Sequence, residues 1–169
     1  MKRIRWRSWW LGLGLMLGGL ALAQGMVHFQ VAVRSPSGQT VNATLYDGNT
    51  SYGYQHIRVR HITGTKTNPG GITSFFPVGY EVRPGVSTPA LMQEDEVVSL
   101  IRTAVVKGAK QSQGGRFAVN YNPGTYGITK MLVVVDSDDG TIITAYPTAG
   151  PSVCTYSDKE HRVISGDCR

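Results

Sequence analysis

Cysteine is scarce in this sequence. Only two cysteines, Cys154 and Cys168, occur among 169 residues, and both lie near the C-terminus. Two thiols allow no more than one intramolecular disulfide, which an oxidising compartment would favour. It would close a loop of about 15 residues and stabilise the fold by roughly 3 kcal/mol in the chain-entropy model. Metal binding by the two thiols with His161 is the alternative, but further ligands are lacking nearby.

A hydrophobic run long enough to span a membrane is also lacking. The longest run, residues 9–23, has about 15 residues, whereas a spanning helix needs roughly 20. Basic residues precede this run, and the small residues Ala21 and Ala23 end it, which is typical of a signal peptide cleaved after Ala23. We therefore expect residues 1–23 to be removed, so that the protein is secreted or periplasmic and keeps no stable membrane anchor. An uncleaved anchor is the alternative.

Net charge is low once this leader is set aside. Its basic residues Lys2, Arg3, Arg5 and Arg7 supply four of the six net positive charges. The rest of the chain carries about +2, so the high isoelectric point of the whole sequence is no argument for nucleic-acid binding. Any basic site has to come from local clustering.

Short apolar runs predict strands along most of the chain, which is long enough for one domain with a modest core. Strands at 26–33 and 41–46 would form an N-terminal hairpin, and residues 74–76 would add a short strand. The strands predicted after residue 114 are 117–121, 128–135 and 141–146, with a hairpin turn at 137–140 between the last two. Residues 131–135 are continuously apolar and predict a central strand covered on both faces.

The clearest helical pattern ends at Lys107. Thr88 would be the N-cap, Pro89 would occupy the first turn, and acidic residues follow where the helix dipole favours them. Gly108 would then occupy the C′ position. Residues 54–62 are compatible with either a helix or a strand. We therefore predict an α+β fold in which an antiparallel sheet packs on one main helix, preceded by an N-terminal β-hairpin.

Residues able to move protons or bind phosphate gather in a few places. Histidine can take or give a proton near neutral pH, and lysine or arginine can stabilise charge on a phosphoryl group. No Asp/Glu/His cluster with metal spacing accompanies them, which favours chemistry without a metal or other cofactor. RNA suits such a set because its 2′-hydroxyl is a built-in nucleophile. The candidates are His56, Arg58, Arg60 and His61; Lys66 in the next loop; Lys107 and Lys110 at the helix end; and Thr144 and Tyr146 on the last predicted strand.

The spacing of the two histidines argues against a shared target. Residues five apart are separated by about 140° on a helix and lie on opposite faces of a strand. Only one histidine would then be the base, unless the backbone bends between them. Histidines among arginines are also typical of a solvated surface. Thr144 and Tyr146 could instead be residues of core strand packing. Lys107 and Lys110 could be solvated charges at a helix end.

Three segments follow the motifs of a known class of bacterial domains. Residues 55–62, Gln-His-Ile-Arg-Val-Arg-His-Ile, resemble the pattern Gly-His-x-x-x-Arg-His-Val and keep its histidine spacing. Residues 73–75 resemble Ser-x-Phe, and residues 140–147 are a hairpin running into Thr-Ala-Tyr-Pro. Residues 54–148 therefore resemble the ribonuclease toxin domains at the C-termini of bacterial contact-dependent inhibition and polymorphic toxin proteins. The resemblance is closest to the bacterial RNase A-like group, with the EndoU-like nucleases as a related alternative.

The resemblance implies that a histidine of the first motif is the base, with Thr144 and Tyr146 in the site. We prefer His61, which adjoins the basic loop, to His56. Members of the RNase A-like group also use a downstream arginine or lysine, and here only Lys66 is present between residues 63 and 82. This departure leaves several candidates for the residue that binds phosphate: Arg58, Arg60, Lys107 and Lys110.

These features predict a secreted, metal-independent endoribonuclease of toxin type that leaves 2′,3′-cyclic phosphate ends. RNA would be its substrate, and a cognate immunity protein is expected as a partner. The expected parts are the hairpin and loop at 24–53, the ribonuclease-like domain at 54–150 and a disulfide-closed tail at 151–169. A non-catalytic secreted binding module of the same fold, which the low charge favours, and an enzyme for another phosphodiester are the alternatives. Convergence of His61, Thr144 and Tyr146 in a cleft would favour an enzyme.

Overall fold

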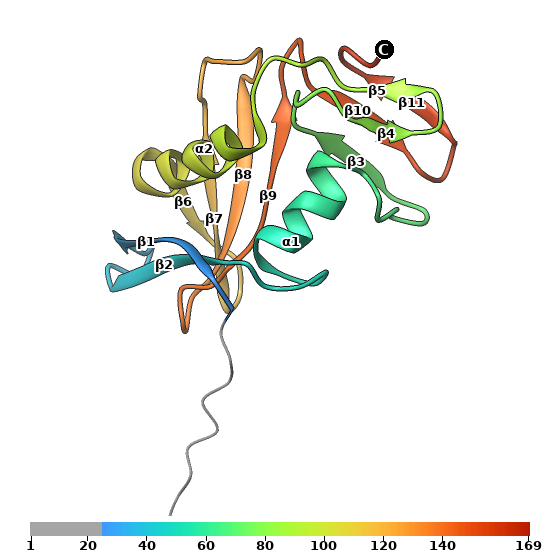
Figure 1. The fold of residues 1–169 in the computed structure, drawn as a ribbon. Coiled ribbons are helices and arrows are strands. Elements are labelled where there is room, and N and C mark those ends of the chain that lie inside the picture. The colour runs from blue at the N-terminus through green and yellow to red at the C-terminus, as the bar shows by residue number, and fades with distance from the viewer. Residues whose placement is uncertain (1–24) are drawn as a thin grey trace, which may run out of the picture.

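The computed structural model describes residues 25–169, so the predicted signal peptide lies outside the described residues. Over this range the fold is α+β, as the sequence predicts, with mostly antiparallel sheets and two short α-helices (Figure 1). The helical elements are α1 (Gly53–Ile57), the π-helical turn η1 (Arg58–Ile62) and α2 (Glu94–Lys107). None of the helices in the described range is long and apolar enough to cross a membrane.

The largest sheet is antiparallel and has the strand order β6-β7-β8-β9. Its strands are β6 (Ala109–Ser112), β7 (Arg116–Tyr121), β8 (Lys130–Asp136) and β9 (Ile142–Ala149). Helix α2 packs on one face, because alternate apolar residues of the strands share a core with the apolar stripe of α2.

Strand β8 is central in this sheet, but its two faces differ. Met131, Val133 and Val135 are buried in the core with α2, whereas Leu132 and Val134 between them stay partly exposed. The prediction that both faces are covered is therefore wrong. A continuous apolar run cannot reveal that α2 covers only one of the two faces.

Within residues 25–169, three smaller sheets complete the fold. Strands β1 (Val27–Arg34) and β2 (Thr40–Tyr46) form the predicted N-terminal hairpin. A three-stranded sheet has the order β11-β10-β3, and β4 pairs with β5. Helix α1 lies between β9 and the three-stranded sheet (Figure 1). The remaining bounds are β3 (Ile72–Phe75), β4 (Glu81–Arg83), β5 (Val86–Ser87), β10 (Cys154–Ser157) and β11 (Arg162–Ser165).

Helix α2 begins later than predicted. Its N-cap is Gln93, whose N–H donates to Oε2 of Glu96 at 2.6 Å in a capping box. Thr88 instead accepts a hydrogen bond from the N–H of Gly79 at 3.0 Å, in the loop before the helix. The predicted cap was wrong because Thr88 and Pro89 resemble a helix start, and only the downstream Gln93 has the reciprocal partner.

The end of α2 at Lys107 agrees with the prediction, but the reason for Gly108 differs. Gly108 is extended, with φ −72° and ψ 155°, instead of left-handed. A Cβ there would come within 2.5 Å of Val119 Cγ1 and 2.7 Å of the Ala104 carbonyl oxygen. Glycine is therefore required by the close approach of α2 to β7 and not by a turn.

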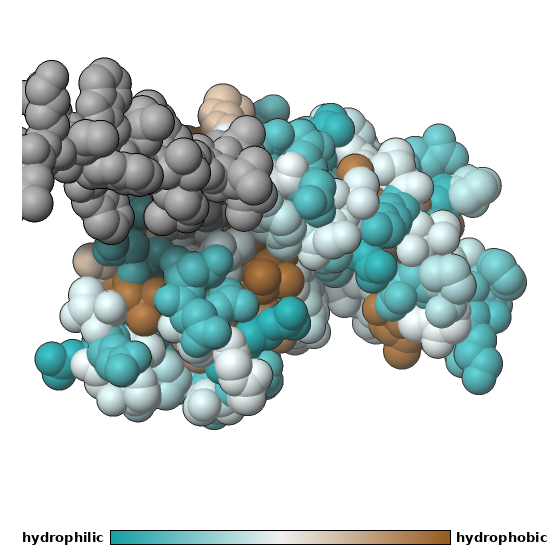
Figure 2. All heavy atoms as spheres, turned by 90° about the horizontal axis from the view of Figure 1, so that it is seen from below, coloured by the Kyte–Doolittle hydropathy of each residue, from teal (hydrophilic) through white to brown (hydrophobic). Residues whose placement is uncertain are grey.

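One hydrophobic core joins the hairpin, both helices and the largest sheet. Val33 and Leu45 of the hairpin, Ile57 of α1, Ile101 of α2 and Val133 of β8 all belong to it. Where the surface is visible in Figure 2, hydrophobic residues form separate patches among hydrophilic ones. Such scattered apolar residues are normal on a folded domain.

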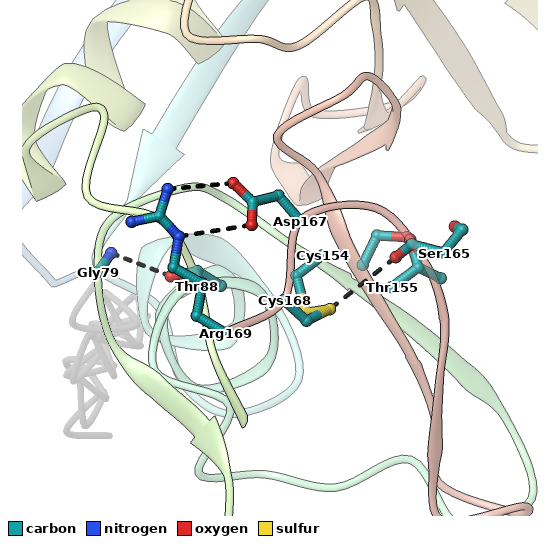
Figure 3. Close-up of a disulfide and its surroundings, with 9 residues drawn as sticks. Gly79, Thr88, Cys154, Thr155, Ser165, Asp167, Cys168 and Arg169 are labelled. Carbon is teal, nitrogen blue, oxygen red and sulfur yellow. Dashed lines mark hydrogen bonds and ion pairs between the residues drawn. A yellow bond between two sulfur atoms is a disulfide. The ribbon is translucent and has the colours of Figure 1, made fainter. Parts of the chain in front are cut away.

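The predicted disulfide between Cys154 and Cys168 is present (Figure 3). Next to it, the backbone of Arg169 exchanges two hydrogen bonds with Ser87, at 2.6 and 2.8 Å. The disulfide therefore joins the C-terminal residues to β10, and the two hydrogen bonds join them to β5. Residues 154–165 also form the β10–β11 hairpin, which the sequence had not indicated.

Candidate functional site

A pocket of about 240 Å³ lies between η1, β3 and β9. The four residues predicted to be catalytic all contribute to it, and so does one predicted substrate-binding arginine. Two larger hollows, of about 400 and 350 Å³, contain neither histidine nor arginine. The smaller pocket is therefore the candidate site; its lining residues are His56, Arg60, His61, Asn68, Ile72, Ser74, Thr144 and Tyr146.

The two histidines approach each other because the helix changes its winding between them. After α1 the chain continues as the π-helical turn η1, in which the Thr63 N–H donates to the Arg58 carbonyl oxygen five residues earlier, at 2.8 Å. The ring centroids of His56 and His61 are 6.2 Å apart. The expectation that they diverge by about 140° is wrong, because it assumed α-helical winding. Single π turns are rare and occur frequently at functional sites.

His61 is buried, with 8% of its surface exposed. Its Nδ1 lies 2.9 Å from the Ser74 carbonyl oxygen, which can only accept, so Nδ1 carries the proton and Nε2 keeps a lone pair. The ring stacks on Tyr146, with centroids 4.9 Å apart. Burial is the main cause that lowers the pKa of His61 to about 4, so the imidazole is neutral at pH 7.

His56 has the same tautomer in a more open position. Its Nδ1 donates to the Thr50 carbonyl oxygen at 2.9 Å, and Lys66 Nζ donates to the same oxygen at 2.9 Å. Burial lowers the pKa of His56, and the nearby charges of Arg60 and Lys66 lower it further. Within residues 25–169, no hydrogen bond engages Nε2 of either pocket histidine.

Two polar atoms at this pocket are buried without a partner among the described residues. They are Nε of Arg60 and Oγ1 of Thr144, and no other side-chain nitrogen or oxygen in residues 25–169 shares that state. A buried polar group without a hydrogen bond destabilises a fold by about 1–3 kcal/mol, so each such group needs an explanation. Both residues line the pocket, so the two unpartnered groups belong to its wall.

Strand β9 presents two hydroxyl groups to the pocket. Side chains alternate along a strand, so Thr144 and Tyr146 share a face while Ala145 points into the core. Burial raises the pKa of the Tyr146 phenol, which therefore stays protonated at neutral pH. The alternation explains why two hydroxyl groups two residues apart reach the same site.

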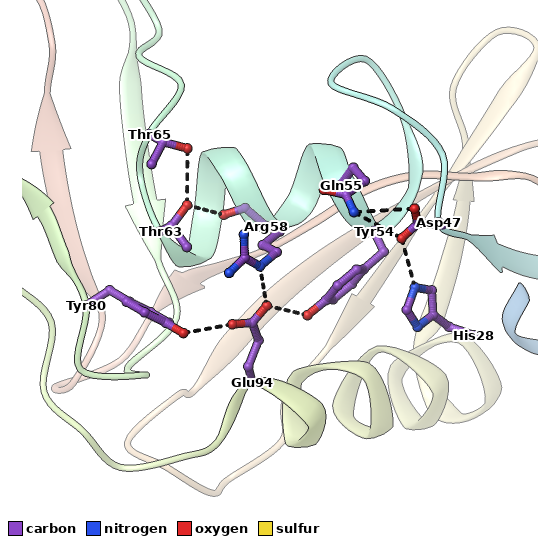
Figure 4. Close-up of polar contacts among 9 residues, drawn as sticks. All are labelled: His28, Asp47, Tyr54, Gln55, Arg58, Thr63, Thr65, Tyr80 and Glu94. Carbon is purple, nitrogen blue, oxygen red and sulfur yellow. Dashed lines mark hydrogen bonds and ion pairs between the residues drawn. The ribbon is translucent and has the colours of Figure 1, made fainter. Parts of the chain in front are cut away.

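Arg58 does not line the pocket and points toward Glu94 (Figure 4). Its Nε donates to Glu94 Oε1 at 2.6 Å, beside a hydrogen bond from the Tyr54 hydroxyl to the same oxygen. Lys107 and Lys110 lie at the end of α2 and in β6, and neither lines the pocket. Of the basic residues predicted to bind substrate, Arg60 contributes to the pocket lining and Lys66 approaches it through the contact at Thr50.

The sequence did not single out three pocket residues, Asn68, Ile72 and Ser74, as site residues. Ser74 belongs to the second motif, and Asn68 lies in the loop that the sequence predicts. The turn residues Asn68-Pro69-Gly70 are the signal that could have indicated Asn68 itself. A buried ion pair holds this loop in place: Arg83 Nε donates to Asp158 Oδ1 at 2.7 Å. The two partners are 75 positions apart in the chain, so no local pattern reveals their pairing.

Within residues 25–169, no group of three or more His, Cys, Asp or Glu side chains could hold a metal ion. The polar groups of the pocket are instead two imidazoles, a guanidinium, an amide and three hydroxyls. Such groups can transfer protons and bind an anion. Comparison with known proteins found no matching family model, curated protein or solved structure.

Proposed function

We propose that this protein is a metal-independent endoribonuclease that cleaves RNA through attack of the ribose 2′-hydroxyl on the adjacent phosphodiester. The observation that carries the proposal is a single pocket containing two histidines, each with Nε2 available, beside the unpartnered Arg60 Nε and Thr144 Oγ1. The two histidines can accept and donate protons, and the side chains of Arg60 and Thr144 can bind the phosphoryl oxygens.

In the proposed reaction, Nε2 of His61 accepts the proton of the 2′-hydroxyl. The bond from this oxygen to phosphorus forms as the bond from phosphorus to the 5′-oxygen breaks. Protonated His56 gives its proton to the leaving 5′-oxygen, and the product is a 2′,3′-cyclic phosphate. Because their ring centroids are 6.2 Å apart, the two histidines can serve different oxygens of one phosphodiester.

The assignment of base and acid follows from the surroundings of each ring. His61, with a pKa of about 4, is already neutral at mildly acid and neutral pH, as a base must be. The pKa of His56 is also lowered, by burial and by the charges of Arg60 and Lys66, but less than that of the more deeply buried His61, so His56 takes up a proton more readily than His61 does. Arg60 and Thr144 bind the non-bridging oxygens, and the stacked ring of Tyr146 fixes the plane of His61.

The wider assignment follows the resemblance of the motifs to bacterial ribonuclease toxin domains. We assign the chain to the RNase A-like or EndoU-like type, secreted through its N-terminal signal and opposed by an immunity protein in the producing cell. The disulfide supports an oxidising destination. A non-catalytic binding module is the second candidate, because the chain after residue 23 carries only about +2 net charge, little for RNA binding.

Incubation of the protein, beginning at Gln24, with RNA in excess EDTA tests the proposal. We expect cleavage and 2′,3′-cyclic phosphate ends, identified by mass spectrometry. His61→Ala should cleave about 10²- to 10⁴-fold more slowly, which is the usual effect of removing a positioned acid or base.

The matched control is His161→Asn, which removes an exposed histidine outside the pocket. His161 has φ +50°, a conformation that asparagine tolerates, so the variant should keep wild-type activity. RNA that stays intact with the wild-type protein, or is cut only when a divalent ion is added, would refute the mechanism. Binding of RNA without cleavage would favour the binding module.

A further inference from the structure

Asn68 is the first residue of a hydrogen-bonded turn at the pocket. Residues 68–71 form a β-turn in which the Gly71 N–H donates to the Asn68 carbonyl oxygen at 2.8 Å. Pro69 and Gly70 fill its centre, and Gly70 has φ +78°, as the third position of a type II turn requires. A Cβ at Gly71 would meet only the end of the Asn68 side chain, which lies over the turn.

Hydrogen bonds with Asp158 also hold the turn in place. The backbone N–H of Asn68 donates to Asp158 Oδ2 at 2.9 Å, and the N–H of Asp158 donates to the Gly71 carbonyl oxygen at 3.0 Å. Asp158 is in turn paired with Arg83, and the two side chains are each 6% exposed. Both ends of the turn are therefore fixed to a buried ion pair, and the Asn68 position is pre-organised.

The side chain of Asn68 is unused by the fold. Among residues 25–169 its amide makes no side-chain hydrogen bond, and only its backbone is engaged. It lines the pocket next to Ile72, whose side chain is unusually exposed for an isoleucine, at 62%. A free amide beside an exposed apolar side chain offers N–H donors, a carbonyl acceptor and an apolar contact surface.

We propose that Asn68 determines base specificity, by pairing its amide with the donor and acceptor edge of one nucleobase next to the cleaved bond while Ile72 contacts the base face. This inference rests on the proposed ribonuclease function. Single-stranded RNA exposes its base edges in this way, and amide side chains read a donor–acceptor pair bidentately. Arg83 and Asp158 act as positioning residues because they hold the turn and touch no substrate.

Cleavage rates of the sixteen dinucleoside monophosphates, measured as kcat/KM in EDTA, test this inference. We expect the wild-type protein to prefer one base at one side of the bond, and Asn68→Ala to reduce the ratio of best to worst substrate roughly 10-fold or more, as expected for one bidentate pair. Cleavage of the worst substrate should change little. Asn68→Asp, which replaces the donor by an acceptor, should redistribute the preference.

Two further variants distinguish a loss of base recognition from a loss of folding. Asn122→Ala removes an asparagine that lines a different hollow and should keep the wild-type ratio. Asp158→Asn should lose the preference as Asn68→Ala does, with kcat on the worst substrate retained; if it does not fold, the Asn68 variants decide.

Different results would overturn the specificity role of Asn68 and the ribonuclease function. An unchanged ratio in Asn68→Ala, or a wild-type protein that cuts all sixteen substrates equally, overturns the specificity role and leaves the ribonuclease function standing. If the wild-type protein cuts none of the sixteen substrates and also leaves longer RNA intact, both the specificity role and the ribonuclease function are overturned.

Discussion

Burial decides the protonation state of His61 and thereby couples the site to stability. Its pKa is about 4 in the folded protein and about 6.5 in an unfolded chain, so the unfolded state binds the proton more readily between these values. The stabilisation from keeping His61 neutral is therefore complete above pH 6.5 and is lost as pH falls toward 4. Its size is about 3 kcal/mol.

Urea denaturation at pH 7 and pH 4 measures this coupling. The wild-type protein should lose about 3 kcal/mol more of its unfolding free energy on acidification than His61→Gln, which cannot take up the proton. Equal losses in the two proteins would mean that His61 is not held neutral by burial.

Thr144 illustrates a conflict between stability and function within one side chain. Thr144→Val keeps the shape and removes the unpartnered hydroxyl, so the unfolding free energy should rise by about 1 kcal/mol. The same change should lower kcat/KM roughly 10²-fold, as the loss of a donor to a developing anion does. Thr73→Val is the matched control, because the Thr73 hydroxyl donates to Asp158 and lies outside the pocket lining. Thr73→Val should lower the unfolding free energy because it removes this hydrogen bond. A lower unfolding free energy in Thr144→Val would contradict the account.

At the scale of elements, Glu94 fixes the start of α2 to the helix that carries the histidines. It accepts hydrogen bonds from Tyr54, Arg58 and Tyr80, at 2.6, 2.6 and 2.9 Å (Figure 4). Burial alone would raise the pKa of this carboxyl, but the three hydrogen bonds outweigh it and hold the pKa below its ordinary value. The resulting stabilisation is present above the ordinary glutamate pKa and is lost as pH falls through the lowered one.

Glu94→Gln should therefore lower the unfolding free energy at pH 7 by about 1–3 kcal/mol. Asp95→Asn is the matched control: it removes the same charge from the same first turn, where Asp95 is exposed and makes no side-chain hydrogen bond to the rest of residues 25–169. Thermal unfolding of the two variants compares them. Equal destabilisation would show that only the helix dipole matters and that the links to Tyr54, Arg58 and Tyr80 contribute nothing.

Elements were predictable where one local pattern dominates. The N-terminal hairpin follows from alternation. The three strands predicted after residue 114 follow from short apolar runs and a hairpin turn, and the end of α2 follows from Lys107 and Gly108. The π turn at Arg58–Ile62 was not predictable, because its sequence equally suits an α-helix or a strand and the winding is set by packing of Ile57 and Ile62 in the core. The proximity of His56 and His61 depends on that turn.

At the scale of the whole molecule, long-range pairing limits what the sequence reveals. His56, His61, Thr144 and Tyr146 were predicted as one set through motif resemblance, and the structure places them around one pocket. Asn68 was not predicted, because its position depends on Asp158, ninety residues away. The β10–β11 hairpin was missed for a similar reason: β10 is short and is held by pairing with β3 and by the disulfide.

The most direct test of the central claim uses one RNA oligonucleotide in two forms, with EDTA present. The first form is all ribonucleotide, and the second carries a single 2′-deoxynucleotide on the 5′ side of the bond that is cut fastest. If the 2′-hydroxyl is the nucleophile, the protein cuts the first form there and leaves that bond intact in the second, while other bonds in both are cut at equal rates. Cleavage of the same bond in both forms would contradict the account.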